Sequence, residues 1–179
     1  MIFEKGTMMA DAKSNIVLIG MPGAGKSTLG IVLAKIMNYD FLDADLVIQQ
    51  QCDRTLQRLI DSCGPEGFIE VENQVLSGIE CEGTILATGG SAVYSDEAMT
   101  HLSDIGTVVY LQIGFDALAE RLSDFSERGV VMRSGMGMSL RDLYDERRPL
   151  YERFAEVTVD VDGLTITEAA QKVAAAIEG

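Results

Sequence analysis

The sequence has too few cysteines and histidines for a disulfide framework or a zinc site. Its three cysteines are an odd number without a C-x-x-C pair, and His101 is the single histidine. Disulfide frameworks use paired cysteines in oxidising compartments, and structural zinc sites use four Cys or His ligands. We therefore expect a protein of a reducing compartment, the cytoplasm.

Long apolar runs are also lacking. No stretch approaches the length of a membrane-spanning helix, and residues 1–14 are interrupted by Glu4, Lys5, Asp11 and Lys13. A signal peptide needs a continuous apolar core. We interpret residues 1–14 as a loose leader and expect a soluble protein without a membrane partner.

Positive charge is scarce as well. The formal net charge of the 179 residues is -14, and no long basic stretch offers a surface for a nucleic-acid backbone. A small-molecule ligand is easier to accommodate, and we expect a monomer. With 47% hydrophobic residues, the chain can bury one full core.

The apolar pattern alternates between strands and helices. Short buried runs predict strands at residues 15–19, 40–43, 84–87, 107–112 and 157–161. Three- and four-residue spacing predicts helices at residues 26–37, around 47–48, and at 66–76, 96–102, 115–122 and 167–177, with a break at Gly64 and Pro65. This order is typical of a three-layer, doubly wound α/β domain with a five-stranded parallel sheet, here spanning residues 15–179.

One segment fits neither a core element nor an ordinary loop. Residues 126–139, SERGVVMRSGMGMS, contain too much glycine for a stable helix and too many apolar residues for a solvated loop. We expect a moving lid at about residues 124–139.

The strongest functional signal is GMPGAGKS at residues 20–27. It fits the phosphate-binding pattern G-x-x-x-x-G-K-[ST] and lies between a predicted strand and a predicted helix. In such a loop the backbone N–H groups face a polyphosphate, Lys26 adds a charge at the β/γ phosphates, and the Ser27 hydroxyl serves Mg²⁺. The alternative is a glycine turn that matches by chance.

Two absences narrow the class of nucleotide-binding protein. The sequence has no N-K-x-D guanine signature, and neither residues 84–87 nor residues 107–112 end in an aspartate. Instead Asp43 and Asp45 follow a predicted strand with an i, i+2 spacing that points both carboxylates to one side of an extended chain. They could position a metal-bound water and an attacking hydroxyl. Alternatively, Asp45 caps the next helix and Asp43 is a turn residue.

A double glycine follows another strand. Gly89 and Gly90 come directly after residues 84–87, where a ligand could approach the bare backbone. The alternative explanation for the two glycines is a tight turn whose backbone needs positive φ angles.

Taken in order, GMPGAGKST, the D-x-D of FLDADLVI, LATGGSAV and ERRPLYERFAE resemble the shikimate kinase family. The resemblance covers nearly the whole chain from Asn15 onward. It implies a nucleoside-monophosphate-kinase-like fold, ATP with Mg²⁺, and transfer of the γ-phosphoryl group to a hydroxyl of shikimate in aromatic amino-acid biosynthesis.

The resemblance also implies which residues bind ATP. These are Gly23, Ala24, Gly25, Lys26, Ser27 and Thr28 of the loop, together with Arg121 near the adenine and Arg128 in the lid. Lys26 and Arg128 would act catalytically on the transferring phosphoryl group. Ser27 would bind Mg²⁺ directly, and Asp43 through a water molecule.

For the acceptor, the resemblance implies that Asp45 orients or deprotonates the hydroxyl, that Gly89 and Gly90 line the site, and that Arg147 binds the carboxylate. The late arginines Arg141 and Arg153 are instead expected on solvated helix faces, beside Asp145 and Glu152. The predicted activity is thus an ATP-dependent phosphotransferase with an alcohol group as acceptor.

The sequence departs from the family pattern at three places. The F-R-x-x-E motif reads FIEVE at residues 68–72, so Ile69 stands where a second carboxylate-binding arginine is expected. The glycine triplet ends in Ser91, and the lid motif R-P-L-L reads RGVV at residues 128–131. Two alternatives therefore stay open: another small hydroxyl acceptor such as homoserine, or a nucleotide-binding regulator that has lost transfer.

Overall fold

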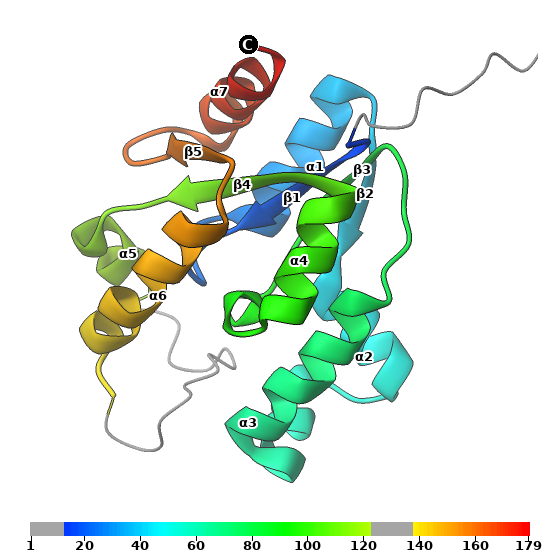
Figure 1. The fold of residues 1–179 in the computed structure, drawn as a ribbon. Helices are drawn as coiled ribbons and strands as arrows, with labels where there is room; N and C mark the ends of the chain where they lie inside the picture. The colour runs from blue at the N-terminus through cyan, green and yellow to red at the C-terminus, as the bar shows by residue number, and fades with distance from the viewer. Residues whose placement is uncertain (1–12, 123–137) are drawn as a thin grey trace, which may run out of the picture.

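A computed structural model describes residues 13–122 and 138–179. Its centre is a five-stranded, all-parallel sheet with the strand order β2-β3-β1-β4-β5 (Figure 1). The strands are β1 Asn15–Ile19, β2 Asp40–Asp43, β3 Thr84–Ala87, β4 Gly106–Gln112 and β5 Val157–Asp160. The predicted fold class is confirmed.

The central strands are buried on both faces. Every residue of β1 and β3 is buried, which explains their continuous apolar sequences, because a parallel sheet is covered by helices on each side. The amino end of the sheet is held by Asn15, whose side-chain amide donates to the carbonyls of Cys81 and Ile105 and accepts from the N–H of Thr84.

Helices cover the sheet in two layers. The helix α1 packs with α7 on one face, and α4 and α6 lie on the other face, where α3 packs against α4 (Figure 1). The helices are α1 Lys26–Met37, α2 Ala44–Cys52, α3 Leu56–Ser77, α4 Asp96–Ile105, α5 Phe115–Leu122, α6 Leu140–Phe154 and α7 Ile166–Glu178, with a 3-10 turn η1 Ala92–Tyr94.

The predicted break at Gly64 and Pro65 is confirmed, because the range of α3 consists of two helical segments that meet at a kink. Gly64 has φ 73, which is non-helical, and α3 continues on both sides of this kink. On α6, Arg141 forms the expected ion pair with Asp145, at 3.0 Å. Arg153 is exposed on α6 as expected, but it pairs with Asp96 of α4, and Glu152 pairs with Arg148.

The topology indicates where on the sheet a ligand is expected to bind. Strand β1 lies between β3 and β4, so the chain winds away from β1 in both directions and the strand order reverses there. Crossover connections diverge at such a point, at the carboxyl ends of the strands. Among the helices of residues 13–122 and 138–179, none has both the length and the apolar composition to cross a bilayer.

Candidate phosphoryl-transfer site

The loop at residues 20–27 connects β1 to α1, as the motif predicts. Gly20, Gly23 and Gly25 have φ angles of 145°, 85° and 91°, conformations that residues with a Cβ atom rarely adopt. Gly25 caps α1 without a side-chain hydrogen bond. The N–H groups of the first turn are therefore available to an anion such as a phosphate.

Lys26 is folded into the centre of this loop. Its ammonium donates to the carbonyls of Gly20, at 2.7 Å, and Met21, at 3.0 Å, and the residue is only 8% exposed. Burial lowers the pKa of Lys26 to about 8, against the opposing effect of the nearby Asp45 carboxylate. The cation is thus held at the position where the loop would receive phosphates.

Asp43 and Asp45 occupy two different elements. Asp43 ends β2 and is the N-cap of α2, where its Oδ1 accepts from the N–H of Asp45 at 3.0 Å. Asp45 already lies in the first helical turn, so the expectation that both residues project from one extended strand was wrong. Capping thus belongs to Asp43, whereas the proposed alternative gave it to Asp45.

The Asp45 carboxylate points toward the turn that follows β3. A Cβ atom at Gly89 would lie 3.0 Å from Oδ1 of Asp45. Burial raises the pKa of Asp45, the negative charge of Asp43 raises it further, and Lys26 opposes both effects.

Close contacts, not positive φ angles, explain the glycines at positions 89 and 90. Neither residue has a positive φ angle, so the alternative of a strained tight turn is excluded. A Cβ atom at Gly90 would lie 2.8 Å from Cδ of Pro22 and 2.9 Å from Nη1 of Arg147. The bare backbone of Gly90 thus allows the phosphate-binding loop and α6 to approach closely.

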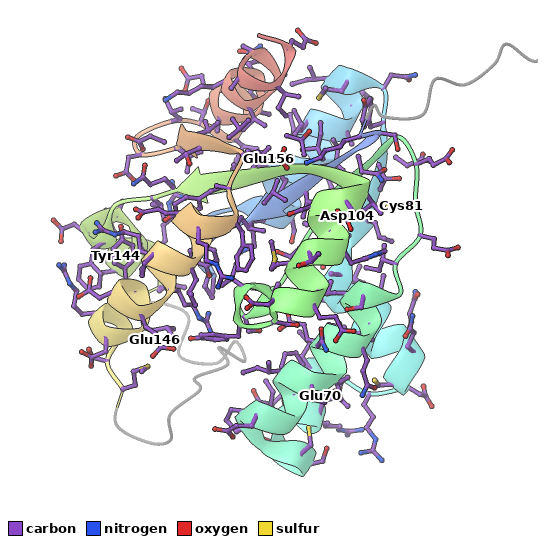
Figure 2. The ribbon with its side chains drawn as sticks, viewed as in Figure 1. Glu70, Cys81, Asp104, Tyr144, Glu146 and Glu156 are labelled. Atoms are coloured by element: carbon purple, nitrogen blue, oxygen red, sulfur yellow. The ribbon has the colours of Figure 1, made fainter. Side chains whose placement is uncertain are left out.

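Arg147 is held on α6 by groups that the sequence did not reveal. It is 1% exposed, its Nε donates to the hydroxyl of Tyr94 at 3.1 Å, and Cζ lies 5.1 Å from the centroid of that ring. The Tyr94 hydroxyl donates to Glu146 at 2.6 Å; Figure 2 labels Glu146 on α6. Tyr151, one turn after Arg147, donates to the carbonyl of Gly90 at 2.7 Å.

Glu72 adds a further acid beneath the same turn. It lies on α3, is 1% exposed, and its Oε2 accepts from the Ser91 hydroxyl at 2.6 Å. A Cβ atom at Gly89 would lie 2.5 Å from its Oε1. Burial raises the pKa of Glu72 to about 7, an effect that the Ser91 hydrogen bond opposes and the charge of Asp45 reinforces.

From the sequence, Glu72 is part of the departing FIEVE motif and, with Glu70 and Asp45, a possible partner for the ammonium group of an acceptor such as homoserine. Its contact with Ser91 joins α3 to the turn after β3, two segments whose pairing no local sequence pattern reveals. Ile69 lies one helical turn earlier on α3 and packs against an apolar cluster formed by Ile48, Leu59, Phe68 and Val75.

Of the remaining predicted residues, Arg121 lies on α5, and its Nη1 donates to the carbonyl of Gly23 at 3.4 Å. This places a guanidinium beside the phosphate-binding loop. Ser27 and Thr28 begin α1 and are exposed. Arg128 and residues 124–137 of the predicted lid lie outside the described residues, as do residues 1–12 of the predicted leader.

The structure therefore gathers charged groups from four helices around the Gly89–Gly90 turn. Lys26 interacts electrostatically with Asp45, Arg147, Asp43 and Glu72. A phosphate-binding loop beside a buried carboxylate and a buried guanidinium can bind a nucleotide and an anionic acceptor together. Such positioning, with charge stabilisation, is the main requirement of phosphoryl transfer.

Comparison with known proteins agrees with this geometry. The family model described as "Shikimate kinase" matches residues 22–178. A shikimate kinase of Francisella tularensis subsp. holarctica is 38% identical over 161 residues, which are 89% of this chain and 92% of the relative.

Solved structures show the same similarity. The shikimate kinase from Acinetobacter baumannii in complex with shikimate superposes with a TM-score of 0.82 at 31% identity, over 92% of this chain and 93% of that one. The shikimate kinase from Bacteroides thetaiotaomicron gives a TM-score of 0.75 at 28% identity, over 92% and 98% of the two chains.

The contacts at Gly90 generate a prediction about packing. In Gly90→Ala the new methyl group must displace Pro22 or Arg147, so we expect a loss of about 1–3 kcal/mol in the free energy of unfolding, measured by urea denaturation. Gly78→Ala is the matched control, because a Cβ atom at Gly78 meets its nearest neighbour at 3.5 Å. Equal stability of the two variants would contradict the close approach at Gly90.

Proposed function

Because the chain belongs to the shikimate kinase family, we propose that it is an ATP-dependent kinase that transfers the γ-phosphoryl group to a hydroxyl of shikimate. The observation that carries this proposal is the convergence of Lys26, Asp45 and Arg147 on one bare turn of backbone. These residues supply a cation for the phosphates, a carboxylate for the hydroxyl and a cation for an acidic acceptor.

ATP is the donor used by this family, and the loop supports its binding here. The N–H groups of Gly23 and Gly25 and of the first helical turn, including Ser27 and Thr28, would face the phosphates, whereas the N–H of Ala24 donates to the carbonyl of Met21 at 3.1 Å. Lys26 would exchange its two carbonyl partners for phosphate oxygens. Arg121 would lie over the loop on the adenine side, because its guanidinium already contacts Gly23.

The oxygen ligands near the loop fit Mg²⁺. Ser27 offers an exposed hydroxyl, and Asp43 a carboxylate with one oxygen engaged in capping α2. Mg²⁺ favours a few oxygen ligands of this kind together with phosphates and water, and the described residues contain no larger cluster of His, Cys, Asp and Glu that would hold a metal alone. Bound there, Mg²⁺ would neutralise phosphate charge.

Asp45 and Arg147 would bind different groups of the acceptor. The Asp45 carboxylate would accept a hydrogen bond from the attacking hydroxyl, and could take its proton as the bond to phosphorus forms. Its raised pKa, caused mainly by burial, suits a group that receives a proton. Arg147, fixed by Tyr94, would bind the carboxylate of shikimate next to Gly90, so that the hydroxyl faces the phosphates.

The setting of the enzyme is also part of the proposal. We place it in the cytoplasm, as a monomer, with small-molecule ligands alone. The free cysteines Cys52, Cys63 and Cys81 and the net charge of -14 support a reducing compartment and oppose a nucleic-acid partner.

The direct test is acceptor-dependent release of ADP from purified protein with ATP and Mg²⁺, measured in a coupled assay. We expect turnover with shikimate and little with homoserine. The control is Lys26→Ala, which should lower the turnover rate by about 100-fold or more, since it removes a charge aimed at the phosphates.

Turnover with homoserine but not with shikimate would identify an amino acid as the acceptor. Glu72 would then be the first residue to test as the partner of the ammonium group of homoserine. Binding of ATP without turnover on either acceptor would contradict the kinase proposal. It would favour a regulator that retains the nucleotide site.

A second prediction separates the role of Asp45 from nucleotide binding. Asp45→Asn keeps the size of the side chain but removes the proton acceptor, so kcat should fall about 100-fold or more. The Kd for ATP, measured by calorimetric titration, should change by less than about 3-fold. Equal losses in both quantities would rule out the acceptor role and indicate a disturbed phosphate-binding loop.

A further inference from the structure

Glu72 is a buried acid that the proposed reaction leaves without a task. One carboxylate oxygen, Oε2, accepts from Ser91, whereas Oε1 has no hydrogen-bond partner within the described residues. A buried carboxylate with an unsatisfied oxygen is costly in its charged form, because it has lost water without gaining equivalent donors. Burial of Glu72 therefore favours its protonated form, against the Ser91 hydrogen bond and the positive charges of Arg147 and Lys26.

The charges that face Glu72 come from three other helices. They are Asp45 on α2, Arg147 on α6 and Lys26 on α1. On α3 itself, position 69 lies three residues before Glu72 and is close enough for an ion pair, but Ile69 packs there against apolar side chains. No cation on its own helix face thus holds Glu72 in the charged state.

The hydrogen bond from Ser91 engages Oε2 and leaves Oε1, the atom next to Gly89, open to carry a proton. Because burial raises the pKa of Glu72 to about 7, both protonation states are populated near neutral pH in the absence of ligand. A ligand that prefers one state can therefore shift the balance.

We propose that Glu72 takes up a proton from solvent when the acidic acceptor binds, and that the affinity for the acceptor falls as Glu72 ionises. This inference rests on the proposed function, since it requires an acceptor with a carboxylate at Arg147. An incoming anion adds negative charge where Asp45 and Glu72 already lie, and protonation of Glu72 removes one of these charges. The proton returns to solvent when the product leaves. Glu72 is thus a positioning residue that acts through charge.

The test is calorimetric titration of the whole protein with shikimate at about pH 7.5, in two buffers of different ionisation enthalpy. For the unmodified protein we expect uptake of about half a proton or more, and an affinity that falls about 10-fold between about pH 6 and pH 8. In Glu72→Gln, which mimics the protonated acid, the uptake due to Glu72 should disappear and the affinity should change less than about 2-fold over that range.

The same variant separates Glu72 from Lys26, because any proton that Lys26 binds would still be taken up in Glu72→Gln. Ser91→Ala provides a second measurement if Glu72→Gln folds poorly. It removes the hydrogen bond that lowers the pKa of Glu72, so the fall in affinity should move to higher pH. A purely structural role of Ser91 would change affinity equally at every pH.

Proton uptake that is unchanged in Glu72→Gln, or a pH dependence that does not move in Ser91→Ala, would overturn the inference while shikimate still binds. Failure of the unmodified protein to bind shikimate at all would be a different result. It would contradict the proposed function, and the inference would fall with it.

Discussion

The site depends on the absence of side-chain atoms at Gly89 and Gly90. Four elements reach this turn: Glu72 and Asp45 at Gly89, and Pro22 and Arg147 at Gly90. A methyl group at either glycine would occupy space within 3.0 Å of these atoms. The sheet places the turn at the carboxyl end of β3, next to the loop that follows β1. Close packing against the backbone of this turn therefore sets the distances between the charged side chains of the site.

The charges around the turn are not balanced by simple pairs. Burial lowers the pKa of Lys26 to about 8 and raises that of Glu72 to about 7, so both groups are less firmly charged than they would be in water. A charged ligand that binds beside these two groups would therefore shift the protonation of both. The substrates would thus supply the charges that balance those of the site.

Much of the fold could be predicted from the sequence, because five buried runs alternate with amphipathic segments and each run fits a strand covered on both faces. The nucleotide loop could be predicted too, since three glycines and a lysine in fixed order have a defined geometry. The contacts of Arg147 could not be predicted from the sequence. Tyr94 and Glu146 hold it through an unpredicted 3-10 turn, and their pairing joins segments far apart in the chain. The expectation that Asp43 and Asp45 both project from one strand was wrong, because Asp43 caps α2 and the helix begins at Ala44, directly after β2.

The proposed function requires the buried guanidinium of Arg147 to bind the carboxylate of the acceptor rather than the nucleotide. Calorimetric titration of Arg147→Met with shikimate and, separately, with ADP tests it most directly, because methionine keeps an apolar stem of similar shape. We expect shikimate affinity to fall about 10- to 100-fold, as loss of a hydrogen bond to a charged group implies, while ADP affinity changes less than about 2-fold. Unchanged shikimate affinity, or equal losses for both ligands, would contradict the account.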